Sequence, residues 1–394
     1  MSGEATAAVR LRTQDGAFVS GLLRTPAGGA GTVVSIMHPR EDVTHHPQVS
    51  QLLDQGFAVW TQGTRSMNND MRLLHEQAVL DVAAGQTFLE EQDFESRVAL
   101  GHSGGATLFA FYQEQAGLHA GERLTSAPDG TPVDLAAARM PMPDGSIFMA
   151  PHPGQGVLLQ RVIDPSITDE SDPTSVDPSL DAFDPANGFR PAPDSSSYAP
   201  EFVERYRAAQ KARVHRLDRL AAESVEATRH HQDLAAETGN EAHRRRALTP
   251  DIMIVHRTDA DLRSLDLTID PNRRPYGSLF GRRPDLGNHG FAGFCRITTP
   301  SAWMSTWSAT TSRANFVKNV SAVASPTLLI ELTGDQACFP ADARQMYAAL
   351  PALDKKHVRV AGTHFGGAVA PGEPTGTELA AQQIGRWLKE RFTA

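Results

Sequence analysis

The stretch "VALGHSGGA", residues 98–106, places a serine between glycines where one structural element should give way to another. Its first residues are small or β-prone and predict a buried strand, and the run "ATLFAFYQEQA" that follows predicts a helix. Gly101, Ser103 and Gly105 form the pattern G-x-S-x-G, in which the glycines let the flanking backbone pass closely and the serine hydroxyl stands exposed at the end of a strand. Glycine-serine turns before helices are common, so the pattern needs partners elsewhere in the chain.

The bulk composition limits the kind of partner that the chain binds. A length of 394 residues predicts one large domain with an insertion, or two domains. A net charge of −9 disfavours nucleic acid and anionic membrane surfaces as partners, and no apolar run approaches the roughly 20 residues that span a bilayer. Two cysteines, Cys295 and Cys338, are too few for a disulfide framework. We therefore expect a cytoplasmic protein that binds a small molecule.

Short strand-like and helix-like runs alternate on both sides of the opening stretch. Asp15-Gly16 is a turn dipeptide with alternating flanks and predicts an opening hairpin. Further strands are predicted within residues 32–37, 57–63, 97–101, 146–154, 325–340 and 355–367, and helices within 48–57, 69–92, 106–116 and 376–392. This alternation predicts an α/β fold, a mostly parallel, doubly wound sheet with helices on both faces.

The composition changes between the earlier and the later strands. Residues 164–200 are rich in Asp, Pro and Ser and predict an extended or poorly ordered stretch. Residues 201–237 predict a charged helix, most simply a solvated lid helix, with a homodimer through this helix as the alternative. We therefore expect a core made of residues 1–154 and 310–394, and a cap, or lid, made of residues 155–309.

Ser103 needs a base and an acid, because a serine hydroxyl is a weak nucleophile. Asp335 lies just past one later strand and His364 just past the next, so three reactive side chains follow three separate strands in the order nucleophile, acid, base. The alternatives are structural: Ser103 caps its own turn, His364 bonds to backbone, and Asp335 caps a helix starting near Pro340. In the last case Asp164 would act as the acid.

These residues resemble those of the α/β-hydrolases, over residues 1 to about 154 and about 310 to the end, with the insertion where family members carry a cap. The resemblance implies that Ser103 is the nucleophile, Asp335 the acid and His364 the base, and that no cofactor is needed. The family usually has His-Gly after its third strand, with the oxyanion donor next. Here "MHPRED" has His38-Pro39 instead, so the resemblance implies an oxyanion hole made by the backbone N–H groups of Gly104 and Arg40.

Other side chains are expected near the same edge of the sheet. We expect His38, Arg40, Arg65 and His102 to contact the substrate, and the two guanidinium groups would favour an acidic one. The alternative is that the arginines pair with Glu41, Asp42 or Asp70. No metal site is predicted, because His38, His45, His46 and His152 match no metal-binding spacing. The cap aromatics Tyr276, Phe280, Trp303 and Trp307 line either a pocket roof or the core of the cap.

The sequence therefore predicts a serine hydrolase that cleaves a carboxylic ester through an acyl-enzyme. One alternative uses the same residues to hydrolyse a carbon-carbon bond in a vinylogous diketone. Another, from a different class, is a non-catalytic receptor that keeps the scaffold for ligand binding.

Overall fold

The computed structural model describes residues 4–393 and is built on one eight-stranded sheet. The strands are β1 (Ala5–Arg12), β2 (Phe18–Thr25), β3 (Thr32–Met37), β4 (Ala58–Gln62), β5 (Ser96–His102), β6 (Gly145–Met149), β9 (Thr327–Leu332) and β10 (Lys355–Val360). They lie in the order β1-β2-β4-β3-β5-β6-β9-β10. The opening hairpin β1-β2 is antiparallel and β2 pairs antiparallel with β4, whereas all later neighbours are parallel. The predicted mostly parallel sheet is confirmed.

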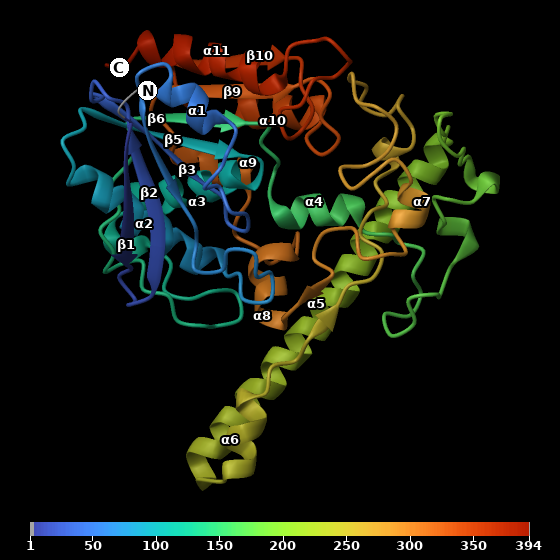
Figure 1. Cartoon of the computed structure of the whole chain (residues 1–394). Coiled ribbons are helices and arrows are strands. Elements are labelled where there is room, and N and C mark those ends of the chain that lie inside the picture. Colours follow the sequence, from blue (N-terminus) through green and yellow to red (C-terminus); the bar gives the residue numbers. More distant parts are fainter. Residues whose placement is uncertain (1–3, 394) are drawn as a thin grey trace.

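Helices cover both faces of the sheet (Figure 1). One face packs on α1 (Gln48–Leu53) and α11 (Gly376–Lys389), through strand residues such as Val98 and Leu100. The other packs on α2 (His75–Glu90), α3 (Gly104–Gly117), α9 (Phe316–Asn319) and α10 (Pro340–Ala349), with Ala99 from the same strand. Successive strand residues point to opposite faces. Because both faces are covered, β3, β4, β6 and β9 are buried along their whole length, which explains their continuous apolar runs.

Residues 155–309 build apolar clusters of their own. One joins α4 (Gln155–Val162) to α5 (Pro200–Thr238) and to Trp303 and Trp307, and the other joins the start of α5 to Leu262 and Leu265. The two main clusters of the sheet draw only on residues outside this range. The shorter elements are η1 (Ala120–Glu122), η2 (Pro178–Leu180), η3 (Pro185–Asn187), α6 (Glu241–Leu248), β7 (Met253–Ile254), η4 (Leu262–Ser264), α7 (Pro284–Gly287), β8 (Ile297–Thr298), α8 (Pro300–Ala302), η5 (Trp303–Trp307) and η6 (Val320–Ala322).

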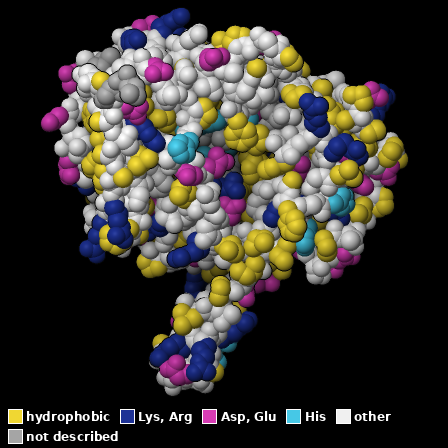
Figure 2. Space-filling model, in the orientation of Figure 1, with side chains coloured by type: hydrophobic (Ala, Val, Ile, Leu, Met, Phe, Trp, Pro, Cys, Tyr) yellow, Lys and Arg dark blue, Asp and Glu magenta, His cyan; other side chains and the backbone are white. Residues whose placement is uncertain are grey.

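The helix α5 has two different halves. Its first half packs into the cap through Phe202, Tyr206, Val214 and Leu217. Its second half projects from the body of the protein, which it still contacts where Arg229 donates to the carbonyl oxygen of Asp129. The helix α6 folds back beside this half to form the arm, residues 222–250 (Figure 1). None of these arm residues is buried, and Lys or Arg side chains cluster with hydrophobic ones at its tip (Figure 2). Within residues 4–393 no helix combines the length and apolar character that crossing a bilayer requires.

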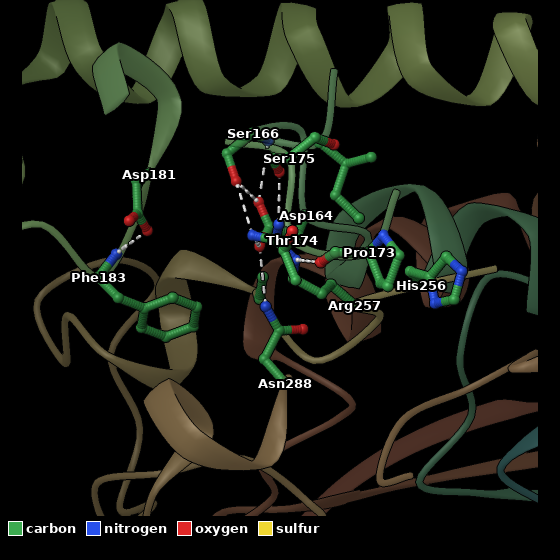
Figure 3. A network of polar contacts seen from close by, with 12 residues as sticks. Asp164, Ser166, Pro173, Thr174, Ser175, Asp181, Phe183, His256, Arg257 and Asn288 are labelled. Atoms are coloured by element: carbon green, nitrogen blue, oxygen red, sulfur yellow. Dashed lines mark hydrogen bonds and ion pairs between the residues drawn. The ribbon is translucent and has the colours of Figure 1, made fainter. Parts of the chain in front are cut away.

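The Asp-rich stretch 164–200 is a succession of tight turns, so the expectation of a poorly ordered stretch is wrong. Aspartates such as Asp172 and Asp177 accept hydrogen bonds from the N–H two residues ahead, which is the local pairing that favours Asp in turns. Figure 3 shows how the start of the stretch is held: Asp164 accepts from Ser166 and Asn288, and Arg257 reaches the carbonyl oxygen atoms of Pro173 and Ser175. Polar contacts thus order the start of the stretch, while Ala182 and Tyr198 nearer its end pack into the second cap cluster.

Candidate active site

The turn between β5 and α3 has the strained geometry that the motif predicts. Ser103 has φ of 54° and ψ of −117°, a conformation costing about 1–3 kcal/mol in a non-glycine residue. A Cβ atom on Gly101 would lie 2.4 Å from the backbone nitrogen of Ala106, and one on Gly105 would lie 2.3 Å from the carbonyl oxygen of Met37. Glycine is therefore required at both positions, and the tight turn leaves Ser103 half-buried at the carboxyl end of β5.

Ser103, His364 and Asp335 form one chain of contacts. Ser103 Oγ lies 3.1 Å from His364 Nε2, and His364 Nδ1 lies 2.8 Å from Asp335 Oδ2. The other carboxylate oxygen of Asp335 accepts the N–H groups of Ala337 and Cys338 at 2.7 and 2.9 Å, which fixes the carboxylate with Oδ2 toward the imidazole. Burial alone would lower the pKa of His364, but the charge and hydrogen bond of Asp335 outweigh it and raise this pKa above its usual value.

Neither structural alternative for the acid fits the geometry. The helix after Asp335 begins at Pro340, and Phe339 is its N-terminal flanking residue, so Asp335 accepts hydrogen bonds from the turn before this helix and not from the helix itself. Asp164 lies in the cap network, where it accepts from Ser166, Asn288 and Arg257. Asp335, and not Asp164, therefore lies against His364.

His102 supports the loop that carries His364. His46 Nδ1 accepts the N–H of Gln48, so a neutral His46 carries its proton on Nε2, 3.1 Å from His102 Nδ1. His102 Nδ1 is then an acceptor, and its Nε2–H donates to the carbonyl oxygen of His364 at 2.9 Å. Burial lowers the pKa of His102 well below its usual value and that of His46 to about 4, which keeps both rings neutral. Through this contact His102 positions the backbone of His364, while its expected contact with substrate stays a prediction.

Of the two residues expected to form the oxyanion hole, Gly104 opens α3 and Arg40 lies just past the end of β3. Arg40 N–H donates to His38 Nδ1 at 3.2 Å, and Glu41 N–H donates to the same atom at 2.9 Å. The N–H expected to face a substrate oxygen is thus directed at an imidazole. The Nε2 edge of that imidazole instead faces Gly104, together with His152 and Gln155, two residues to which the sequence analysis gave no role in this site.

The guanidinium groups of both arginines predicted to bind substrate are paired with carboxylates of the chain. Arg40 makes two contacts of 2.6 Å with Asp70, and its guanidinium lies 4.7 Å from the ring centre of Trp307. Arg65 pairs with Asp81 at 2.7 Å and with Asp15. Both arginines therefore pair with carboxylates of the chain, as the alternative to substrate binding predicted. Asp70 was among the predicted partners, whereas Asp81 and Asp15 were not.

Three of the four cap aromatics, Tyr276, Trp303 and Trp307, pack in or against the apolar clusters of the cap. Trp303 and Trp307 are fully buried in the apolar core of the cap, and Trp303 donates to Asp218 at 2.8 Å. Phe280 lines a pocket beside the loop that follows Asp335, together with Phe294 and Phe339. Tyr276 packs at the edge of the second cap cluster. The space beside Phe280 measures only about 10 Å³, and Ser103 and His364 do not line it, so a role of Phe280 in the roof of a substrate pocket stays a prediction.

A single group of three metal-ligating side chains occurs within residues 4–393, formed by Asp335, Cys338 and His364. Two of these already face each other as a carboxylate-imidazole pair. The Cys338 thiol donates to the carbonyl oxygen of Ala150 at 2.9 Å and lies 3.9 Å from His364 Nδ1. The group is thus part of the chain of contacts that ends at Ser103.

Comparisons with known proteins find similarity in structure alone. No protein-family model and no curated protein matches the sequence. The structure is similar to that of DcsB in complex with its substrate analogue, with 12% identity, a TM-score of 0.51, and coverage of 98% of this chain and 99% of that one. It is also similar to the α/β hydrolase GrgF from Penicillium sp. sh18 (12% identity, TM-score 0.49, 98% and 99% covered). A third similar structure is the esterase domain of a Rhodothermus marinus protein (10% identity, TM-score 0.46, 98% of each chain covered).

At such identities the likeness concerns the fold. What the structures share is a mostly parallel eight-stranded sheet with helices on both faces. The chain has the α/β-hydrolase fold.

Proposed function

We propose that the protein is a serine hydrolase that cleaves a carboxylic ester through an acyl-enzyme. The observation that carries the proposal is the chain of contacts from Ser103 Oγ to His364 Nε2, 3.1 Å, and from His364 Nδ1 to Asp335 Oδ2, 2.8 Å. A nucleophile, a base and an orienting acid within hydrogen-bond reach are what acyl transfer by serine requires.

The polarity of these contacts sets the order of proton transfers. Asp335 accepts the Nδ1–H of His364, which leaves the lone pair of Nε2 facing the Ser103 hydroxyl. As Ser103 Oγ forms its bond to the ester carbon, its proton moves to Nε2. The imidazolium then gives this proton to the departing alkoxide, and a water molecule deprotonated by Nε2 releases the acid and restores Ser103. Asp335 keeps its hydrogen bond to Nδ1 and stabilises the imidazolium.

The aromatic side chains beside the loop after β9 do not define the shape of the substrate. The space that Phe280, Phe294 and Phe339 line measures only about 10 Å³, which is too little for an acyl group, and Ser103 does not line it. The guanidinium groups of Arg40 and Arg65 already pair with carboxylates of the chain, so the proposal assigns no acid group to the substrate.

The test is labelling with a fluorophosphonate, followed by mass spectrometric location of the adduct and assay of aryl esters. We expect the wild-type protein to carry the adduct on Ser103, and Ser103→Ala to lose the adduct and about 10⁴–10⁶-fold in kcat. The exposed Ser179→Ala, a serine-to-alanine change in the cap, is the matched control and should label like the wild type.

The outcomes separate the three function classes. A folded wild-type protein without an adduct would contradict the hydrolase and favour a receptor. An adduct on Ser103 with turnover of a dienol diketone but of no ester would keep the nucleophile and replace the ester with a carbon-carbon bond.

A further inference from the structure

Three nitrogen atoms converge on one small volume beside the nucleophile. A Cβ atom on Gly104 would lie 2.5 Å from Gln155 Nε2, 2.8 Å from His38 Nε2 and 3.2 Å from His152 Nε2. The three side chains come from different elements: His38 follows β3, His152 follows β6, and Gln155 opens α4. Glycine at position 104 is therefore required by these side chains and not by the turn itself. We call the three residues the nitrogen cluster.

The hydrogen bonds of the two imidazoles fix where their protons lie. His38 Nδ1 accepts the N–H groups of Arg40 and Glu41, and His152 Nδ1 accepts the N–H of Gly154 at 3.0 Å. A neutral imidazole that accepts at Nδ1 carries its proton at Nε2. Neither Nε2 atom is hydrogen-bonded to another group within residues 4–393, so each directs a free N–H toward Gly104.

Burial keeps both rings neutral. Desolvation, with the charge of Arg40 second, lowers the pKa of His38 well below its usual value. Desolvation, with the charges of His364, His75 and Arg40 behind it, lowers the pKa of His152 to about 3. At neutral pH each imidazole therefore offers one N–H donor and does not compete with His364 as a base.

Gln155 adds a donor that has no use in the folded chain. The side chain is 2% exposed and faces the buried His75, but neither atom of its amide is in hydrogen-bonding geometry with a partner within residues 4–393. Because a buried amide without a well-placed partner is unfavourable, its retention beside the nucleophile points to a ligand oxygen that completes it.

We propose that the Nε2–H groups of His38 and His152 and the amide N–H of Gln155, with the backbone N–H of Gly104, hold the oxyanion. The proposal rests on the proposed function. When Ser103 Oγ bonds to the carbonyl carbon, the π electron pair of the C=O bond moves to the oxygen, and these donors stabilise the resulting charge. The pair returns when the bond to the leaving group breaks. His38 thereby replaces the Arg40 N–H, which is held by His38 Nδ1.

Gln155→Met gives the sharpest test, because methionine has a similar length and no donor. Loss of one oxyanion donor lowers kcat by about 10²–10³-fold, so we expect kcat to fall by about 10²-fold with little change in KM. Since the amide has no partner in the chain, the melting temperature should stay the same or rise. A structural role predicts the opposite: a lower melting temperature with kcat retained.

Two substitutions at His152 separate its two nitrogens. Asparagine can replace the Nδ1 acceptor but not the distal donor, whereas glutamine can bring an amide N–H to the position of Nε2. We expect His152→Asn to lose about 10²-fold in kcat and His152→Gln to recover part of it. Inhibition by an aryl trifluoromethyl ketone, which forms a tetrahedral adduct with an activated serine, should weaken in proportion to kcat across the series.

Failure of this proposal is distinguishable from failure of the proposed function. If wild-type Ser103 takes up no fluorophosphonate, the hydrolase itself is contradicted. If the wild type is labelled and hydrolyses esters while Gln155→Met and His152→Asn each keep kcat within about threefold, the nitrogen cluster does not hold the oxyanion, and the hydrolase stands.

Discussion

Asp335 and Asp164 are both fully buried aspartates, yet they have different kinds of partner. Asp335 faces one imidazole, and backbone N–H groups satisfy its second oxygen. Asp164 lies among a guanidinium, an amide and a hydroxyl that link distant parts of the cap. The first carboxylate acts on a group whose protonation changes during the proposed reaction, and the second acts on a group that stays charged. Burial alone therefore does not tell a reactive carboxylate from a structural one.

The same contrast holds for the two regions around them. The sheet buries mainly apolar side chains, and its carboxyl edge collects neutral imidazoles. The cap buries arginines: Arg213 pairs with Glu170 at 2.8 Å, and Arg263 pairs with Asp261 at 2.6 Å. Buried ion pairs add little net stability, but breaking one is costly. The cap is thus held by contacts that tolerate loss of a partner poorly.

The largest expected effect is that of Asp335→Asn on the rate and its pH dependence. We expect kcat to fall by about 10⁴-fold, as in serine triads that lose the carboxylate. In the wild type Asp335 holds the pKa of His364 above its usual value, so activity should fall as the pH drops through that raised pKa, where His364 becomes protonated. Without the charge, burial lowers this pKa and the acid limb should move to lower pH. Stopped-time ester assays across pH measure both quantities.

The control for this shift is Asp164→Asn, which should leave the acid limb in place. An unmoved limb in Asp335→Asn would break the distinction between the two aspartates.

The next effect is on stability and concerns Asp164→Ala. This change leaves Arg257, itself 3% exposed, without its carboxylate, and loss of one partner of a buried pair costs about 3–5 kcal/mol. We expect faster amide hydrogen exchange in residues 164–175 and 255–290, while β3 and β5 keep their protection. Mass spectrometry of peptic fragments measures this. Equal acceleration in the strands would mean that cap and sheet unfold together.

The smallest effect is expected for removal of the arm. Ser224 hydrogen-bonds Asp251, so the segments that enter and leave the arm lie together at the base of the arm. A short Gly-Ser linker can therefore replace residues 226–248. Since no arm residue is buried, we expect the free energy of unfolding to change by less than about 1 kcal/mol and kcat to stay within about twofold. Chemical denaturation and ester assay check both. A large loss of activity would give the arm a part in the reaction.

Much of the sheet could be predicted because its signal is local. A strand buried on both faces appears as a short apolar run, as in "TVVSIM", which is β3 from end to end. The carboxyl ends of parallel strands share one edge of the sheet, so the sequence alone predicts that Ser103, Asp335 and His364 lie near one another. The helix α2 begins at His75, later than its apolar spacing predicts, because Asp70 pairs with Arg40 and holds the preceding residues in turns.

The remainder depends on contacts between distant residues. The turns at the start of 164–200 are held by Arg213 and Arg257, which lie far along the chain. No local sequence pattern predicts these contacts between arginine side chains and distant carbonyl oxygen atoms. The nitrogen cluster could not be predicted for the same reason, because its three side chains come from separate parts of the chain. Its one available signal was Gly104, a glycine beyond the needs of the turn, together with His152 and Gln155 just past the next strand in the same sheet.

The projecting α5 also affects how the size of the particle is measured. A helix of 39 residues is about 58 Å long, and its last turns project beyond the body (Figure 1). Such an arm increases hydrodynamic drag much more than mass. A monomer should therefore elute early from a gel-filtration column and sediment slowly for its weight, like a compact protein of larger size. The proposed homodimer through α5 must be tested by light scattering, which reports mass independently of shape.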